Sequence, residues 1–289
     1  MTVLPRLRRA RWWPAAATLT AATLALGTAL LLPLGFSDPN GVDPYVARLS
    51  ITAVLLAAAC FAWRRLEGGR AVMLALVAVT TSFTLLSASP QILVDLFGAG
   101  AGGGAEQILW ASLVQVLVTL ALSWAALRLL RPDLRPSLRL RSFGPAALLF
   151  AVAGAVLFLL VSLALPATLL GRYGLQPVAI ARDLPWLGPA SVMQAFSQEA
   201  QFRGLLMGAL ERVCPRGAAN LGQALFFGLT HLAVNYQGPV GPFIPVTVAV
   251  GLLLGWVVQR TGSLWPAVVI HAVADIAITV AVLPGLYGL

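Results

Sequence analysis

The stretch AALLFAVAGAVLFLLVSLAL, residues 146–165, decides the fold class. It carries no charge, and Ser162 is its one polar side chain. An α-helix rises about 1.5 Å per residue, so a run of this length spans roughly 30 Å, the thickness of the hydrocarbon core of a bilayer. Backbone groups in lipid must satisfy their own hydrogen bonds, which a helix does. The stretch therefore predicts a transmembrane α-helix.

Similar apolar runs recur along the whole chain, whose 289 residues are 59% hydrophobic and 10% charged. A soluble domain usually carries about 25% charged residues. We therefore expect an all-α, polytopic transmembrane helical bundle with about eight or nine spans. The runs lie at about 12–36, 46–63, 71–89, 108–130, 143–170, 189–211, 217–235, 243–260 and 264–284.

The basic residues explain how the chain is expected to lie in the membrane. All 19 are arginine, and they give a net charge of +9. Most cluster in alternate loops, which is the positive-inside pattern of a protein with a cytoplasmic N-terminus. This placement accounts for the charge without a nucleic-acid partner, and membrane lipid is the expected surrounding. An Ala-, Leu- and Arg-rich composition without lysine favours a bacterial plasma membrane.

Two features near the ends of the expected spans have ordinary interpretations. The first run follows the basic stretch MTVLPRLRRARWW and lacks a clean cleavage site, so we expect it to be an uncleaved first helix. The cysteines Cys60 and Cys214 are expected to be simple thiols, because a disulfide or metal framework needs more than two.

Ionisable residues concentrate inside the apolar runs of the last third of the chain. The runs before about residue 185 are nearly devoid of intramembrane polar chemistry. We therefore divide the chain into N-terminal transmembrane helices, residues 1–186, and a second helical unit, residues 187–284. Intramembrane ionisable residues are costly and usually functional, so the second unit is where a site is expected.

Three pairs of polar residues in this unit have the i, i+4 spacing that puts both on one helix face. In SQEAQFRG, residues 197–204, Glu199 precedes Arg203 by four positions, which suits an ion pair. A structural ion pair without catalytic function is the plain alternative for these two. The only histidines of the chain form the other pairs, His231 with Asn235 and His271 with Asp275.

These residue types allow two kinds of hydrolytic site. A carboxylate and an imidazole can activate a water as general bases, and a second histidine can donate a hydrogen bond to a developing oxyanion. The same side chains could instead bind zinc, with Glu199, His231 and His271 as candidate ligands. The residues alone leave both open.

At these positions the chain resembles the CPBP family of intramembrane endopeptidases, which includes CAAX proteases and bacteriocin-processing (Abi-like) proteins. That family has the motifs EExxxR, FxxxH and HxxxN/D on separate helices. Here they read QEAQFR (198–203), FGLTH (227–231) and HAVAD (271–275). The resemblance makes residues 187–284 a CPBP-like catalytic helical core.

The resemblance implies a role for each matching residue. His231 would be the general base, assisted by Glu199, and Arg203 would orient the carboxylate. His271 and Asp275 would stabilise the oxyanion, or bind metal in a metalloprotease. The residues expected to lie near the substrate or to support the site are Gln198, Phe227 and Asn235.

One position departs from the family pattern, because Gln198 stands where the first motif has its first glutamate. A glutamine amide is a poor base. The leading hypothesis is an endopeptidase that cleaves a membrane-associated protein or peptide, such as a prenylated CAAX-like tail, a leader or a sorting peptide. The first alternative is a catalytically weak pseudoprotease or immunity-type binding scaffold. The second is a proton-coupled transporter that uses the same residues as a relay.

Depth in the membrane sets a condition on any shared site. Glu199 and His231 lie about 12–14 residues from the expected cytoplasmic ends of their helices, roughly 18–21 Å, whereas His271 lies only about 7–9 residues in. A common site therefore requires a tilted helix, a broken helix or shifted boundaries.

Overall fold

The structure is a computed structural model that describes residues 70–79, 81–82, 105–130, 135–141, 143–164, 177–231 and 243–286. Every regular element in these ranges is a helix, which confirms the all-α prediction there. The runs expected at 12–36 and 46–63 lie outside the described residues. The count of spans and the cytoplasmic N-terminus therefore stay predictions.

The helices follow the predicted apolar runs closely for α8, α9 and α10, whereas α6 begins at Pro177, twelve residues before the run expected at 189–211. After the helical segment Arg70–Val79 come α4 and α5, and then the helices of the predicted catalytic unit. Their bounds are α4 Ala105–Leu129, α5 Pro145–Ala164, α6 Pro177–Glu199, η3 Ala200–Leu206, α7 Met207–Leu210, α8 Arg216–Thr230, α9 Phe243–Thr261 and α10 Trp265–Leu286.

Two stretches among the described residues, Leu109–Leu129 and Ile244–Thr261, are long and apolar enough by themselves to cross a membrane. Shorter apolar helices are Arg70–Val79, Pro145–Leu160 and Trp265–Ala277. Large apolar side chains stand exposed on α4 and α5, among them Leu117, Trp124 and Leu149. In water this surface would be costly, whereas lipid accepts it at no cost.

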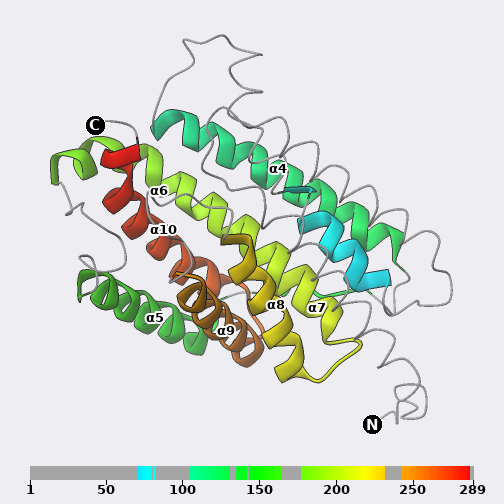
Figure 1. Ribbon diagram of the computed structural model, residues 1–289. Helices are drawn as coiled ribbons and strands as arrows, with labels where there is room; N and C mark the ends of the chain where they lie inside the picture. The colour runs from blue at the N-terminus through cyan, green and yellow to red at the C-terminus, as the bar shows by residue number, and fades with distance from the viewer. Residues whose placement is uncertain are drawn as a thin grey trace.

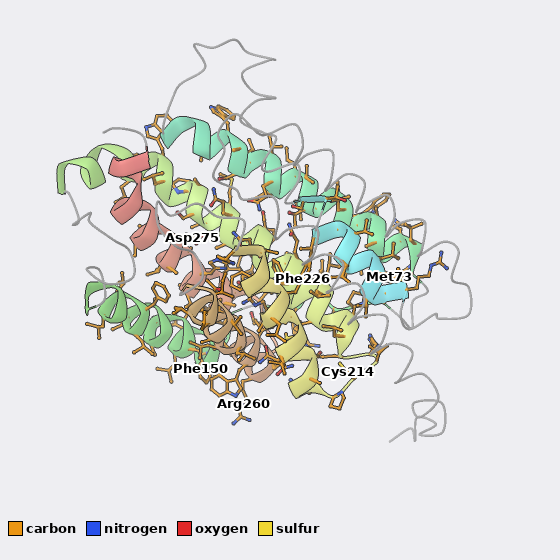
Figure 2. All side chains as sticks on the ribbon, viewed as in Figure 1. Met73, Phe150, Cys214, Phe226, Arg260 and Asp275 are labelled. Atoms are coloured by element: carbon orange, nitrogen blue, oxygen red, sulfur yellow. The ribbon has the colours of Figure 1, made fainter. Side chains whose placement is uncertain are left out.

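Helix α6 is the centre of the bundle and packs against α4 on one side and α10 on the other, while α8 pairs with α9 and α5 pairs with α10 (Figure 1). Phe226 lies in the packed interior, whereas Arg260 and Cys214 lie toward one end of the bundle (Figure 2). The interior therefore collects α6, α8, α9 and α10, the helices that carry the three motifs and their supports.

The main break in regular structure lies directly at the first motif. Helix α6 ends at Glu199, and residues Ala200–Leu206 form a π-helix before α7 begins. All seven of these π-helical residues are buried. A π-helix is rare and frequently marks a functional site, because its wider turn changes which side chains share a face. This is the broken helix that a common site required.

The segment 135–141, which is the described part of the basic stretch RPDLRPSLRLR (131–141), packs against the π-helix as a strap. A Cβ on Gly204 would lie 3.1 Å from Leu138, and a Cβ on Gly208 would lie 3.0 Å from Pro136. Small residues at both positions therefore let the strap approach η3 and α7. An ion pair between Arg139 and Glu211 ties the strap to the end of α7.

Candidate active site

Glu199 and Arg203 form the predicted ion pair on one helix face. Arg203 Nη1 donates to Glu199 Oε1 at 2.8 Å, and both side chains are fully buried. Removing two charges from water is expensive, and a buried pair survives only with good geometry and further hydrogen bonds. The further contacts of Glu199 and Arg203 therefore determine whether the buried pair is stabilised.

Arg203 is held by α8 and α9 as well as by Glu199. Its Nη2 donates to the backbone oxygen of Gly251 at 3.3 Å, and its guanidinium lies 4.3 Å from the ring centroid of Phe227. A cation over an aromatic face gains electrostatic attraction where water is excluded. The guanidinium thus has a carboxylate, a carbonyl and an aromatic face as its surroundings.

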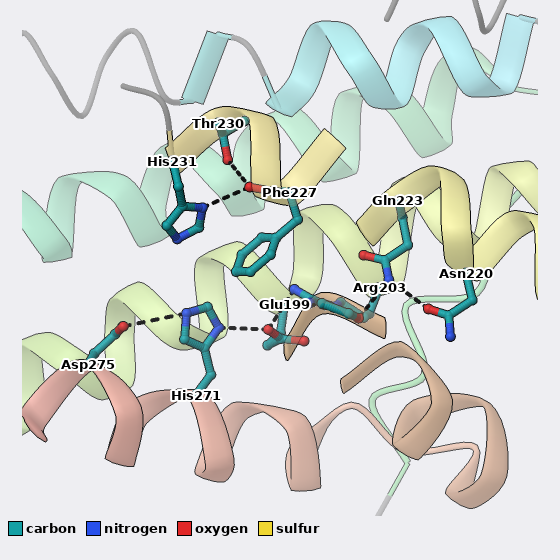
Figure 3. A network of polar contacts seen from close by, with 10 residues as sticks. Glu199, Arg203, Asn220, Gln223, Phe227, Thr230, His231, His271 and Asp275 are labelled. Carbon is teal, nitrogen blue, oxygen red and sulfur yellow. Dashed lines mark hydrogen bonds and ion pairs between the residues drawn. The ribbon is translucent and has the colours of Figure 1, made fainter. Parts of the chain in front are cut away.

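Glu199 also accepts a hydrogen bond from α10. His271 Nδ1 lies 2.7 Å from Glu199 Oε1, so the same oxygen receives both the arginine and the histidine. A carboxylate only accepts, so the ring carries a proton on Nδ1. Nε2 of His271 lies 3.5 Å from Asp275 Oδ1. Arg203, Glu199, His271 and Asp275 therefore form one continuous chain of charges across α10, α6 and η3 (Figure 3).

His231 lies directly after the end of α8 and is held in one tautomer by the backbone. Its Nδ1 lies 2.8 Å from the carbonyl oxygen of Phe227. Because a carbonyl oxygen can only accept, the proton is on Nδ1 and the lone pair is on Nε2. Figure 3 shows the Nε2 side of the ring pointing toward the part of α10 that carries His271 and Asp275.

The Phe227 ring joins the two histidines to the ion pair. Its centroid lies 4.6 Å from that of His231 and 5.6 Å from that of His271, both edge to face. The same ring receives the Arg203 guanidinium. Phe227, which was expected to support the site, contacts three of the five predicted catalytic residues, and its role stays a prediction.

The structure thus gathers all five predicted catalytic residues in one region, with one difference from the expected partners. Glu199 bonds to His271, and no hydrogen bond joins it to His231 in the described part of the chain. Gln198 is half-buried, one position before this network. Asn235, the expected neighbour of His231, lies outside the described residues.

Sequence reasoning missed the polar supports on α8. Gln223 Nε2 donates to Gly251 O at 2.9 Å and to Asn220 Oδ1 at 2.7 Å, and Asn220 Nδ2 donates to Leu252 O at 2.9 Å. Gly251 therefore accepts from both Gln223 and Arg203. The available signal was a pair of amides three positions apart in an apolar helix, opposite the glycines of GLLLG, residues 251–255.

The proposed zinc ligands do not converge in this geometry. Within the described ranges, no group of three or more His, Cys, Asp or Glu side chains is placed to hold a metal ion. Both nitrogens of His271 face carboxylates, and Glu199 faces the positive charge of Arg203. A catalytic zinc site needs three protein ligands around an open position. The residues present do not fit that requirement.

Two carboxylate oxygens in the site are buried without a hydrogen-bond partner in the described structure, Glu199 Oε2 and Asp275 Oδ2. A buried, unpaired carboxylate oxygen is costly unless a donor reaches it. The site is therefore built to receive donors such as a water molecule or the backbone N–H groups of a bound peptide.

Comparison with protein families gives one match. Residues 180–277 match the family described as type II CAAX prenyl endopeptidase Rce1-like. This confirms the resemblance that the motifs indicated, and the matched segment contains all three of them. No curated protein matches the chain. No solved structure matches it either.

Proposed function

We propose that the chain is an intramembrane endopeptidase that hydrolyses a peptide bond of a membrane-associated protein or peptide. The observation that carries this proposal is the buried chain Arg203–Glu199–His271–Asp275 beside His231, whose Nε2 has no hydrogen-bond partner among the described residues. The family match over the same residues supports a hydrolytic use of this arrangement.

The proposed mechanism begins at His231. Its Nε2 takes a proton from a water molecule, whose oxygen attacks the peptide carbonyl and forms a tetrahedral oxyanion. His271, held at Nδ1 by Glu199, turns its Nε2–H from Asp275, whose Oδ1 lies 3.5 Å away, and donates it to that oxyanion. His231 then returns its proton to the leaving nitrogen as the C–N bond breaks, and the products are a carboxylate and an amine.

Glu199 serves in this mechanism as a positioning group for His271. Its Oε1 is occupied by Arg203 Nη1 and His271 Nδ1, and the side chain is fully buried. Arg203 in turn fixes the position of the carboxylate that accepts from His271 Nδ1. No step passes through a metal ion, because the ligand set does not fit one.

The proposed substrate is a prenylated CAAX-like tail, a leader or a sorting peptide, and the proposed location is a bacterial plasma membrane. Such a peptide brings unpaired backbone N–H groups into the membrane, where they need acceptors. The unpartnered oxygens of Glu199 and Asp275 supply acceptors at the site.

The second candidate function is a binding scaffold that holds such a peptide without cutting it. The observation that favours it is Gln198, which gives the first motif an amide where the family has a carboxylate. The contacts of Glu199 sharpen this alternative, because that carboxylate is committed to Arg203 and His271. The enzyme reading consequently depends on His231 acting as the base.

The test uses purified protein in liposomes with a panel of fluorogenic lipidated and leader-type peptides. We expect wild-type protein to cleave at least one class, His231→Asn to abolish cleavage, and a chelator to leave the rate unchanged. Leu117→Ala, on the exposed apolar face of α4, is the control for handling and reconstitution. If the wild type cleaves no peptide and Gln198→Glu does, the wild-type protein is a binding scaffold. Activity that a chelator abolishes and zinc restores would overturn the mechanism.

A further inference from the structure

A row of polar side chains is buried between α4 and the α6–η3 helix. On α4 its members recur at intervals of three and four positions, which places them on one helix face over about 16 Å. Each of these α4 side chains is at most 3% exposed. We name this row, with its partners, the polar seam: Ser82, Ser112, Gln115, Thr119, Ser123, Gln194 and Gln201.

The seam corrects the expectation that the runs before residue 185 are nearly devoid of intramembrane polar chemistry. It lies on the α4 side of α6–η3, whereas Glu199 contacts α10. Gln201 Nε2 donates to Ser82 Oγ and to Thr119 Oγ1, both at 2.6 Å, and Gln194 Nε2 donates to Ser112 Oγ at 2.8 Å. These bonds are separate from those of the candidate active site.

The hydrogen bonds within the seam leave several of its atoms without partners. Both polar atoms of the Gln115 amide, Oε1 of Gln201 and Oγ of Ser123 are buried and have no hydrogen-bond partner in the described structure. Leaving such a group unsatisfied costs about 1–3 kcal/mol each. Gln115 and Gln201 flank Thr119, so their unpaired atoms lie in neighbouring turns of the same interface.

The chemistry of these atoms specifies what can satisfy them. Gln115 presents a donor and an acceptor, Gln201 presents an acceptor, and the seam contains no ionisable side chain. A cation would leave the Gln115 N–H group unpaired, and an anion would leave the two amide oxygens unpaired. A small neutral molecule that both donates and accepts satisfies all of them, and water has these properties.

We propose that the polar seam is a hydrated site in which resident water molecules bridge the Gln115 amide to Gln201 Oε1 and Ser123 Oγ. This inference does not depend on the proposed protease activity. It gives α4 a water-mediated polar contact with the π-helix in addition to the direct contact through Gln201. It also explains how an apolar bundle tolerates the Gln115 amide, which has no hydrogen-bond partner among the described residues.

The direct test is polarisation transfer from water to side-chain amides, measured by solid-state NMR on the full chain in nanodiscs with deuterated lipid. The Gln115 signal is identified by its loss in Gln115→Met. The comparison residue is Gln223, which is also fully buried and whose Oε1 is also unpartnered among the described residues, but whose two amide hydrogens both donate to protein oxygens. We expect rapid transfer to Gln115 and little to Gln223. Equal, slow transfer to both would overturn the proposal.

The second measurement is the unfolding temperature of Gln115→Met, which keeps the length and shape of the side chain but removes its polar atoms. A hydrated seam predicts a fall of several degrees, because the waters lose two partners and Gln201 Oε1 loses its bridge. A dry seam predicts a rise, because two unpaired atoms are removed. Leu113→Met, on the lipid-facing side of α4, is expected to change little. An unchanged or higher temperature for Gln115→Met would contradict hydration.

Discussion

Gly255 is the position at which we predict a packing clash from a single added methyl group. A Cβ placed there would overlap Asn220 Oδ1, and it would lie 2.7 Å from Gln223 Nε2 and 2.8 Å from Asn220 Cγ. Helices α8 and α9 therefore approach at a distance that only glycine allows. We expect Gly255→Ala to force the two amides apart and to weaken the support of Arg203 through Gly251.

The magnitude follows from the bonds that must break. Asn220 loses its bonds to Leu252 O and Gln223, and overpacking a tight interface typically costs about 1–3 kcal/mol. Each buried amide left unsatisfied adds about 1–3 kcal/mol. We therefore expect a loss of about 2–5 kcal/mol in the free energy of unfolding, which is a large share of the total for most proteins.

The assay is reversible unfolding in mixed micelles, with Gly217→Ala as the matched control. Gly217 is an exposed residue in the first turn of α8 and nothing lies within 4 Å of its added Cβ, so alanine there is expected to be neutral or slightly stabilising. Asn220→Ala removes both contacts with Asn220 and leaves only Gln223 Nε2 close to the added Cβ, so the added cost of Gly255→Ala should fall. Equal effects of the two glycine substitutions, or strict additivity with Asn220→Ala, would refute the packing argument.

Two further predictions concern the charges and the thiol. Arg203→Met leaves the Glu199 carboxylate with His271 as its remaining partner, so it should destabilise the protein by about 3–5 kcal/mol in the same unfolding assay. Adding Glu199→Gln should recover part of this loss. Full additivity of the two substitutions would contradict a buried pair. Burial, aided by Glu211, raises the pKa of the Cys214 thiol to about 11. In a Cys60→Ser background, maleimide labelling at pH 7 should therefore be about a hundredfold slower than for a free thiol, and it should rise steeply above pH 9; labelling at the rate of a free thiol would contradict this.

The parts of the fold that sequence predicts are those dictated by local physics. A twenty-residue apolar run must form a helix in lipid, and an i, i+4 spacing places two side chains on one helix face, so the helical class and the pairs Glu199–Arg203 and His271–Asp275 agree with the structure. The helix bounds in the second half differ from the apolar runs by only a few residues for α8, α9 and α10.

Contacts between distant segments could not be predicted in the same way. Glu199 and His271 are 72 positions apart, and nothing in either local pattern shows that they meet. The π-helix has no sequence signature of its own, although it contains Arg203, the last residue of the first motif. The polar seam was missed because serine, threonine and glutamine change the hydropathy of α4 very little, so only the packing of α4 on α6 shows that they share an interface.

The geometry also bears on whether Gln198 ends catalysis. In the family pattern two adjacent glutamates begin the first motif, and adjacent residues point about 100° apart on a helix, so they cannot do the same work. Here Oε1 of the second residue of the two, Glu199, accepts from both Arg203 and His271. Loss of a carboxylate at the first position therefore leaves the Arg203–Glu199–His271–Asp275 chain intact. A purely structural core of this size would be at least as stable with apolar side chains in these four places. Under the proposed function, keeping these four residues polar holds the His271 ring in one orientation toward a bound peptide.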